Sequence, residues 1–342
     1  MNKTEKPATL KDVAALAGVS VMTVSNAINR KGGLSEKTYE KVMEAIRQLN
    51  YAPNTAAKTL KNSKTNTIGV IMADASYYVF SSVLRGITDE AAKRNYKILL
   101  TDTSQDASKE EETINLLANN NVDGMIIVAP HEFKRKYSAR LKELAIPFVV
   151  LMRSVSKLNA EYVVNDNYAG AYQLMEHVYS SGERNFCFLS IDSPSGEMRV
   201  KGYRDYLRDV HADNVTVMQE TVLPQIEEGH AVMLDMIRNG CKSGCVLCGC
   251  DLIAIGAMDA IYESGYQIPR DFRIAGYDDL EMSRYLKVPL TTVRQPFESI
   301  GRESVMLLHN RIEHPDTPFQ SRVLQPELVF ADANLENFSF CY

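Results

Sequence analysis

The chain has 342 residues and a net charge of −5 that is unevenly distributed. Residues 1–66 hold 11 Lys and Arg against 5 Asp and Glu, whereas the rest of the chain holds 27 against 38. This length exceeds what one hydrophobic core comfortably fills, and the lack of a long apolar run excludes a membrane-spanning chain. A basic segment on an acidic body is expected when only that segment meets nucleic-acid phosphate. The charge distribution alone does not distinguish a DNA-binding segment from an ordinary basic protein surface.

The N-terminal segment has the pattern of two short helices joined by a tight turn. Thr9 can cap the first helix and form a capping box with Asp12, and Gly18 can take the left-handed conformation that ends it. Ser20 can then cap a second helix over Val21–Asn29. This arrangement predicts a helix-turn-helix.

A third helix, capped by Ser35, can close a small core over the first two. Its apolar residues at helical spacing are Tyr39, Val42, Ile46 and Leu49. In this motif the second helix enters the major groove, where exposed apolar residues suit contact with thymine methyl groups. The residues expected to contact DNA are Thr9, Val21, Met22, Thr23, Ser25, Asn26 and Asn29. The alternative is a three-helix core with an incidental surface patch, which the agreement of caps, turn and apolar spacing disfavours.

A second DNA-contacting segment is expected just after the third helix. Pro53 ends the preceding region and Asn54 can cap a new helix, but residues 55–60 are too few to hold a helix alone in water. We expect a flexible linker without DNA, and two paired helices over the minor groove on DNA, with Leu60 as an apolar wedge. The residues expected to take part are Asn54, Ala57 and Leu60.

Short apolar runs recur along the rest of the chain with room for a helix between each pair. The runs of a first set are 68–72, 96–100, 122–128 and 148–151, and those of a second set include 185–189, 245–248 and 273–275. Such alternation predicts parallel sheets covered on both faces. The length suits two similar lobes, and ligands bind beyond the carboxyl ends of such strands, so we expect a hinged cleft between the lobes.

Several segments match motifs of one family of regulators. The N-terminal matches are residues 10–14 (LKDVA), 17–20 (AGVS), 23–25 (TVS) and 53–54 (PN), followed by Ala57 and Leu60. The later matches are residues 67–70 (TIGV), 122–124 (VDG), 276–279 (GYDD) and 289–293 (PLTTV). Through these motifs the chain resembles transcriptional regulators of the LacI/GalR family over nearly its whole length. The resemblance implies a homodimer that binds a near-palindromic DNA operator, usually as a repressor, and is switched by a small-molecule effector.

The expected fold is therefore an N-terminal all-α helix-turn-helix head plus an α/β periplasmic-binding-protein-like body of two parallel-sheet lobes. The expected domains are a helix-turn-helix domain at 1–52, a hinge helix and linker at 53–66, a first effector-binding lobe at 67–163 with 295–323, and a second at 164–294 with 324–342.

The resemblance also places side chains in the cleft. Arg199 matches an effector-binding arginine whose guanidinium could bind hydroxyls or a carboxylate, Asp278 matches an acceptor for ligand hydroxyls, and Phe80 matches a stacking position. Phe80 could instead belong to the core, and Asp251 and Asp279 are expected to cap the helices that come after them. The residues expected to bind the effector are Asp74, Tyr77, Phe80, Arg153, Arg199, Cys250 and Asp278.

Three residues depart from the pattern of sugar-binding members. Met152 and Cys250 replace an acidic residue and an asparagine, and Pro224 replaces an aromatic residue used for stacking. The cleft thereby loses hydroxyl acceptors, while Arg153 can add positive charge. A sugar or sugar derivative remains the expected effector, with a phosphorylated, carboxylated or partly apolar molecule, or no ligand at all, as alternatives to a simple hexose.

Four cysteines, Cys241, Cys245, Cys248 and Cys250, lie close together in the sequence. Their spacing matches none of the usual zinc patterns, and on a strand Cys245 and Cys248 would point to opposite faces. We therefore expect small buried thiols and no metal or other cofactor. The cysteines of this chain suit a reducing compartment.

Two other classes of function are weighed against a regulator. A periplasmic-type solute receptor would need an export signal and no helix-turn-helix, and here the N-terminus leads directly into the head, so a cytoplasmic protein is expected.

An enzyme would need a catalytic constellation. None of the six His residues has a recognisable catalytic spacing, and residues 190–196 contain no phosphate loop or nucleophile elbow, so no catalytic residues are expected.

Overall fold

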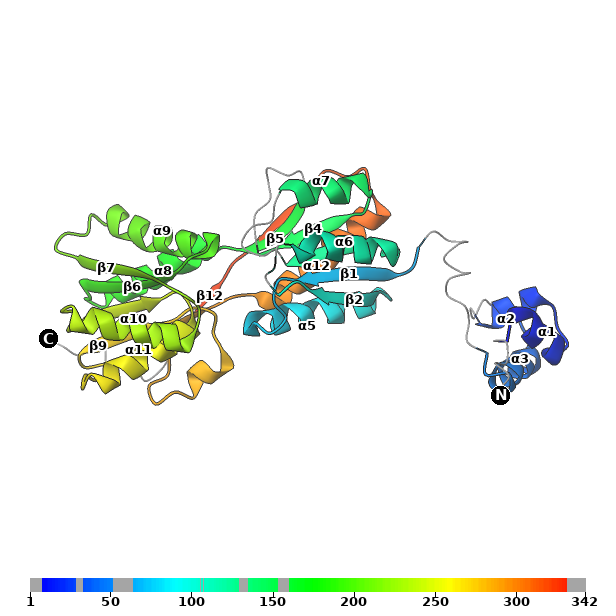
Figure 1. The fold of residues 1–342 in the computed structure, drawn as a ribbon, viewed down its shortest axis with the longest axis horizontal. Helices are drawn as coiled ribbons and strands as arrows, with labels where there is room; N and C mark the ends of the chain where they lie inside the picture. The colour runs from blue at the N-terminus through cyan, green and yellow to red at the C-terminus, as the bar shows by residue number, and fades with distance from the viewer. Residues whose placement is uncertain are drawn as a thin grey trace. The chain divides into compact units, whose positions relative to one another are not determined.

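The computed structural model describes residues 8–28, 33–51, 64–104, 106, 108–128, 135–152 and 160–330. Contacts between residues divide the chain into two compact units, Met1–Thr65 and Asn66–Tyr342. We call them the head and the body (Figure 1).

Three helices form the described part of the head: α1 (Leu10–Ala17), α2 (Val21–Ile28) and α3 (Glu36–Gln48). The predicted caps of all three are confirmed. Thr9 and Asp12 form a reciprocal capping box, Gly18 has a φ of 65°, and the Ser20 and Ser35 hydroxyls accept from backbone N–H groups of their helices. These local bonds explain why such short helices begin and end where they do.

A small apolar core joins the three head helices. Val13, Val24 and Val42 are fully buried, one from each helix. Tyr39, Ile46 and Leu49 pack against this core as predicted. Three short helices are thus held together mainly by one buried layer, since none would be stable alone in water.

The first lobe of the body has a parallel sheet of six strands in the order β11-β5-β4-β3-β1-β2. The strands are β1 (Thr67–Met72), β2 (Lys97–Asp102), β3 (Gly124–Val128), β4 (Phe148–Leu151), β5 (Glu161–Asn165) and β11 (Ser321–Leu324). Helices α5 (Tyr78–Lys93) and α12 (Phe297–Glu313) pack on one face, and α6 (Lys109–Asn119) and α7 (Arg135–Glu143) on the other. This lobe is therefore a three-layer α/β sandwich.

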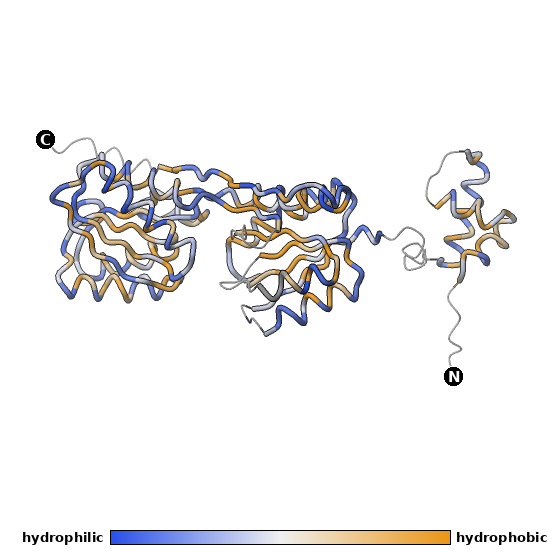
Figure 2. Tube along the Cα trace, turned by 90° about the horizontal axis from the view of Figure 1, so that it is seen from above, coloured by the Kyte–Doolittle hydropathy of each residue, from blue (hydrophilic) through white to orange (hydrophobic). Residues whose placement is uncertain are grey.

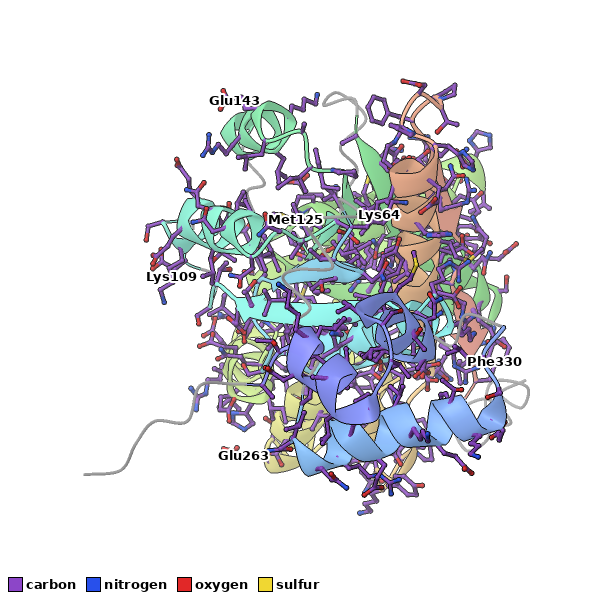
Figure 3. All side chains as sticks on the ribbon, turned by 90° about the vertical axis from the view of Figure 1, so that its right-hand side faces the viewer. Lys64, Lys109, Met125, Glu143, Glu263 and Phe330 are labelled. Carbon is purple, nitrogen blue, oxygen red and sulfur yellow. The ribbon has the colours of Figure 1, made fainter. Side chains whose placement is uncertain are left out.

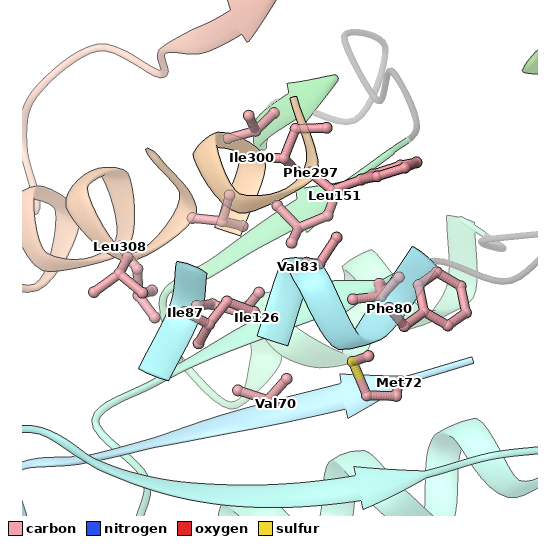
Figure 4. Close-up of a cluster of buried hydrophobic side chains, with 14 of the residues drawn as sticks. Val70, Met72, Phe80, Val83, Ile87, Ile126, Leu151, Phe297, Ile300 and Leu308 are labelled. Carbon is pink, nitrogen blue, oxygen red and sulfur yellow. The ribbon is translucent and has the colours of Figure 1, made fainter. Parts of the chain in front are cut away.

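The core between this sheet and the pair α5 and α12 is continuous (Figure 4). Val70, Val83, Ile126 and Ile300 are fully buried there, and each comes from a different element. On the other face, Met125 is fully buried, whereas the charged side chains labelled with it in Figure 3, such as Lys109 and Glu143, are exposed. Both faces of the sheet are covered, as its apolar strands require.

The second lobe has a parallel sheet of four strands in the order β7-β6-β8-β9. Its strands are β6 (Asn185–Ile191), β7 (Thr216–Val222), β8 (Gly244–Cys248) and β9 (Phe272–Ala275), and its helices are α8 (Asn167–Ser180), α9 (Pro194–Asp209), α10 (Ile226–Arg238) and α11 (Asp251–Glu263). A short helical turn, η2 (Glu281–Arg284), comes after β9. The hydropathy trace in Figure 2 shows the apolar strands at the centre of each lobe.

The chain passes between the lobes three times. β5 of the first lobe leads into α8 of the second, β10 (Thr292–Arg294) leads back into α12, and β11 leads into β12 (Glu327–Val329). β10 and β12 pair antiparallel, and Val293 and Leu328 pack with the second lobe. Three connections between the two lobes are compatible with the predicted hinge.

The predicted α/β architecture of two parallel-sheet lobes is confirmed, with small differences in strand limits. β9 ends at Ala275, as the predicted run 273–275 does, and Asp278 lies in the loop after it. The prediction that Cys245 and Cys248 point to opposite faces is confirmed, because the two thiols lie in different core clusters. The predicted domain limits stay a prediction.

Candidate functional site

The head presents an apolar surface at the start of α2. Val21 is 43% exposed and Met22 is 75% exposed, whereas Val24 and Ala27 on the opposite side of the helix are buried in the core. The two side chains are adjacent, and contiguous exposed apolar surface is typical of a site that a partner covers. Asn26 is partly exposed on the same helix.

Capping fixes the backbone on which these side chains stand. The Thr23 backbone N–H donates to the Ser20 hydroxyl at 3.1 Å, and the two hydroxyls lie 2.9 Å apart. At the start of α1, the Thr9 hydroxyl donates to the Asp12 carboxylate at 2.7 Å, which lowers the pKa of Asp12. The predicted DNA contacts Asn29, Asn54, Ala57 and Leu60 lie outside the described residues.

The body contains a buried polar network centred on Asp278. The Tyr78 hydroxyl and the Gln295 amide both donate to its carboxylate, and an Arg199 guanidinium nitrogen lies 3.9 Å from carboxylate oxygen Oδ1. Tyr78 begins α5 of the first lobe, whereas Asp278 belongs to the loop after β9 in the second lobe. One carboxylate therefore gathers donors from both lobes.

Arg199 is held on every side. Its Nε donates to the Asn167 side chain at 2.9 Å, a terminal nitrogen donates to the Gly249 carbonyl, and the guanidinium lies 3.7 Å from the centre of the Tyr277 ring. Only 5% of the residue is exposed. A buried guanidinium with this set of partners is positioned like a binding-site side chain, because it cannot turn away into solvent.

Amide side chains extend the network beyond Arg199 and Asp278. The Asn165 amide donates to the Gln295 carbonyl oxygen, and the Asn167 amide donates to the Asn165 carbonyl oxygen at 3.3 Å. These residues lie where the chain passes between the lobes. The network therefore links the crossing segments to the two charged groups, so that movement of one lobe would alter its hydrogen bonds.

Burial governs the electrostatics of this site. It raises the pKa of Asp278 even though the Arg199 charge acts in the opposite direction. It also raises the pKa of Cys250 to about 12, which keeps that thiol neutral. The site therefore offers one paired positive group, one hydrogen-bonded carboxyl group and a neutral, polarisable thiol.

The backbone at Asp278 is itself constrained. Its φ of 118° and the φ of 56° at Asp279 lie in the left-handed region that residues other than glycine seldom occupy. The Asp279 carboxylate accepts from Arg294 at 2.6 Å and from Arg284 at 2.8 Å. Surrounding ion pairs thus hold an unfavourable conformation that aims the Asp278 carboxylate at Tyr78.

The remaining residues predicted in the cleft fall into three groups. Tyr77 packs on the Tyr78 ring with 4.7 Å between centroids, so it joins the network region, and the Asp74 carboxylate accepts from the Ser76 backbone and hydroxyl. Phe80 is buried in the core of the first lobe. Arg153 lies outside the described residues.

Four members of the network were not predicted from the sequence: Tyr78 as a donor, Gln295, Asn165 and Asn167. Asp251 was also assigned wrongly. Its carboxylate accepts from the Leu280 backbone N–H and from the Ser283 and Thr292 hydroxyls rather than capping the helix that it begins. These partners come from distant segments, so no local pattern could have revealed them.

An open, largely apolar hollow of about 460 Å³ adjoins the network. Its lining residues are Tyr78, Leu252, Leu280, Glu281, Met282 and Tyr285. Tyr78 thus faces both the hollow and the Asp278 carboxylate.

No metal or membrane site emerges within the described ranges. There, no three His, Cys, Asp or Glu side chains gather in a way that could hold a metal ion, and no helix has the length and apolarity to cross a bilayer. Cys187, Cys241, Cys245, Cys248 and Cys250 are buried free thiols, as expected, whereas Cys341 lies outside these ranges.

Comparisons with known proteins match both units. A model described as bacterial regulatory proteins, lacI family, matches residues 9–54, and one described as a periplasmic binding protein-like domain matches residues 175–331. The HTH-type transcriptional repressor PurR of Vibrio vulnificus is 31% identical over 330 residues, which cover 95% of this chain and 98% of that protein. The ribose operon repressor of Haemophilus influenzae is 30% identical with the same coverage.

A solved structure gives the same picture. The lac repressor dimer bound to operator and the anti-inducer ONPF is 27% identical to this chain and has a TM-score of 0.83. The match covers 96% of this chain and 100% of that one. The similarity thus includes the head and both lobes.

Proposed function

The chain belongs to the LacI family of bacterial regulatory proteins and is a DNA-binding transcriptional regulator, and we propose that it acts as a homodimeric repressor of a near-palindromic operator. A homodimer presents two heads to two half-sites, which is why such operators are nearly symmetric. A small-molecule effector in the cleft between the lobes would switch DNA binding.

The proposal that the head recognises DNA is supported by the exposure of Val21 and Met22 at the capped start of α2. In a helix-turn-helix this turn meets base edges, where the two side chains would cover thymine methyl groups. Thr9, Thr23, Ser25 and Asn26 would add polar contacts, together with the predicted contacts Asn29, Asn54, Ala57 and Leu60.

A binding experiment tests this part of the proposal. A duplex selected from random DNA by the full-length protein should bind with an affinity that falls steeply as salt rises, since the basic head displaces counterions. A variant lacking residues 1–65 should lose all binding while its body stays folded by circular dichroism. Retained operator binding by the truncated body would refute the assignment of the head.

The buried pair Arg199 and Asp278 supports an effector site. A charged pair held by several neutral partners at the junction of two lobes is suited to recognising a small molecule with hydroxyl or anionic groups. One relative is named a ribose operon repressor, and the lac repressor structure holds an anti-inducer. We propose a sugar or sugar derivative, including phosphorylated forms, with Asp74, Tyr77, Arg153 and Cys250 as further contacts, whereas Phe80 is a core residue of the first lobe.

Ligand-induced stabilisation followed by operator binding tests the effector. A panel of neutral sugars, sugar phosphates and sugar acids is screened by thermal unfolding of the full-length protein. A compound at about 100 times its Kd should stabilise the folded state by about 2.7 kcal/mol. The same compound should change operator affinity by about 5–150-fold. A compound that binds the body and leaves operator affinity unchanged would argue against a switch.

We also propose that the protein works in the cytoplasm and without catalytic turnover. The DNA partner and the buried free thiols support the location, and the names of the relatives, which are repressors, support a regulator. Incubation of a bound compound with the protein should leave the compound chemically unchanged by mass spectrometry. Its conversion to a product would contradict this part of the proposal.

A further inference from the structure

The contact between Tyr78 and Asp278 joins the two lobes directly. Tyr78 lies at the first position of α5, and its hydroxyl donates to Asp278 Oδ2 in the second lobe. The two residues are 200 positions apart in the chain. Tyr78 thus supplies a donor from the first lobe to a carboxylate of the second lobe.

We propose that Tyr78 is an internal ligand of the cleft: its phenol hydroxyl takes the place on Asp278 that an effector hydroxyl would occupy, and it latches the lobes together when no effector is bound. The proposal rests on the proposed effector function of the cleft, which it deepens by naming the contact that an effector would replace.

The Asp278 carboxylate is buried and has a donor on each oxygen. Asp278 is only 7% exposed, its Oδ1 accepts from Gln295, and its Oδ2 accepts from Tyr78. Removing the Tyr78 hydroxyl would leave a buried carboxylate oxygen short of a donor, which is unfavourable unless water or a ligand replaces it. Separation of the lobes therefore requires another donor at Oδ2.

Groups other than Tyr78 hold the acceptor in place. Arg199 and Gln295 hold the Asp278 carboxylate, and ion pairs from Asp279 to Arg284 and Arg294 hold the backbone beside it. The acceptor thus has a defined position whether or not Tyr78 is present. A preformed acceptor can take its hydrogen bond from any donor of suitable shape, including a ligand hydroxyl.

The protonation state and the packing of Tyr78 suit it to this role. Burial raises its pKa above the usual range of tyrosine, so the phenol remains a neutral donor. Its ring packs against Tyr77 of its own lobe, and it lines the apolar hollow with Leu252 and Leu280 of the second lobe. The ring therefore occupies a volume shared by the lobes, as an apolar part of a bound small molecule would.

This arrangement defines the chemistry of an effector that could replace the latch. The molecule must bring a hydroxyl or N–H donor to Asp278 Oδ2, and it must fill the apolar space that the Tyr78 ring leaves. An effector without a donor would leave the buried carboxylate unsatisfied and so could not displace the tyrosine. Hydroxylated molecules with an apolar face are the class that fits.

The test compares hydrogen exchange in full-length proteins without DNA or small molecules. The variant Tyr78→Phe removes one oxygen and keeps the ring, whereas Tyr285→Phe is the matched control, because Tyr285 lines the same hollow and is 80% exposed. Tyr78→Phe should speed amide exchange by about tenfold in the first turn of α5 and in residues 278–285, because a hydrogen bond to a charged group is lost. Tyr285→Phe should match the wild type.

A second variant separates the latch from a general loss of packing. Asp278→Asn weakens the acceptor and should speed exchange in the same two segments. Tyr78→Phe should then speed exchange much less in the Asp278→Asn background than it does in the wild-type background. Unchanged exchange in Tyr78→Phe, or equal effects of Tyr78→Phe with and without Asp278→Asn, would overturn the latch. Operator binding by the wild type is measured separately. An absence of operator binding would refute the proposed function and would leave the exchange result unaffected.

Discussion

The carboxylate of Asp251 accepts a hydrogen bond of 2.7 Å from the hydroxyl of Thr292, which joins the start of α11 to β10. The same carboxylate accepts from the Ser283 hydroxyl at 2.7 Å and the Leu280 backbone at 2.8 Å. Asp251 is fully buried, and burial raises its pKa to about 7, with the nearby Asp278 adding to the effect. This group therefore titrates near neutral pH in the folded protein.

Asp251 should make the stability of the body depend on pH. Its pKa is raised in the folded state, so the folded state binds the proton more tightly than the unfolded state does. The contribution to stability is fully present below the usual pKa of aspartate and is lost as pH rises toward 7. We expect the free energy of unfolding of the body to fall by about 4 kcal/mol across that window.

Urea unfolding of the body at several pH values measures this dependence. Asp251→Asn carries no charge and should flatten the profile, whereas Asp213→Asn, at an exposed position, should leave the profile as in the wild type. An identical fall with pH in Asp251→Asn and wild type would show that another group is responsible.

Removing Arg199 should destabilise the body. Arg199→Ala leaves the buried Asp278 carboxylate without its positive partner and the Gly249 carbonyl without its donor. Breaking a buried pair in this way costs about 3–5 kcal/mol. The double variant Arg199→Met with Asp278→Asn removes both charges, and by urea unfolding it should recover much of that loss. Wild-type stability of Arg199→Ala would mean that the pair is not formed in solution.

The head could be predicted closely from the sequence because its determinants are local. The capping box of Thr9 and Asp12, the left-handed Gly18 and the serine caps all act within a few residues of their position. The central strands could also be predicted, since their buried apolar runs are continuous. β7 and β11 are largely exposed edge strands with mixed polarity, so their sequences carry no comparable signal.

The candidate site was only partly predictable. Arg199 and Asp278 were identified through the family resemblance, and the structure brings them together. Tyr78 reaches Asp278 from another lobe, and Asp251 has donors on two segments distant in the sequence, 280–283 and Thr292, so their partners depend on the completed fold. An aspartate at the start of a helix looks like a cap in the sequence, which is why the role of Asp251 was misassigned.

The contact between α5 and α12 should not tolerate a side chain at Gly86. A Cβ atom there would collide with the backbone carbonyl of Glu298, which the fold cannot easily move. Gly86→Ala should therefore destabilise the body by about 1–3 kcal/mol despite the better helix propensity of alanine. Asp89→Ala, at an exposed position of the same helix, is the control for propensity. Stabilisation of Gly86→Ala in urea unfolding would show that the helices can separate.

Base preference should depend on Asn26. This residue is partly exposed on α2, beside the apolar turn proposed to enter the major groove. An asparagine side chain can pair bidentately with adenine through one donor and one acceptor, whereas it has no equally good pairing with guanine. We therefore expect an adenine at one position of each half-site, and Asn26→Ala should relax that preference at a cost of about 1–3 kcal/mol.

Selection of binding sites from random duplexes, followed by affinity measurements on single-base variants of the selected site, checks this prediction. Asn26→Ala should lose discrimination at one base pair per half-site and keep it elsewhere, because the other contacts of α2 remain. Glu40→Ala, at an exposed position on α3, should give the wild-type profile. If Asn26→Ala weakens binding equally for all bases at every position, Asn26 contacts phosphate and the recognition of adenine belongs to another residue.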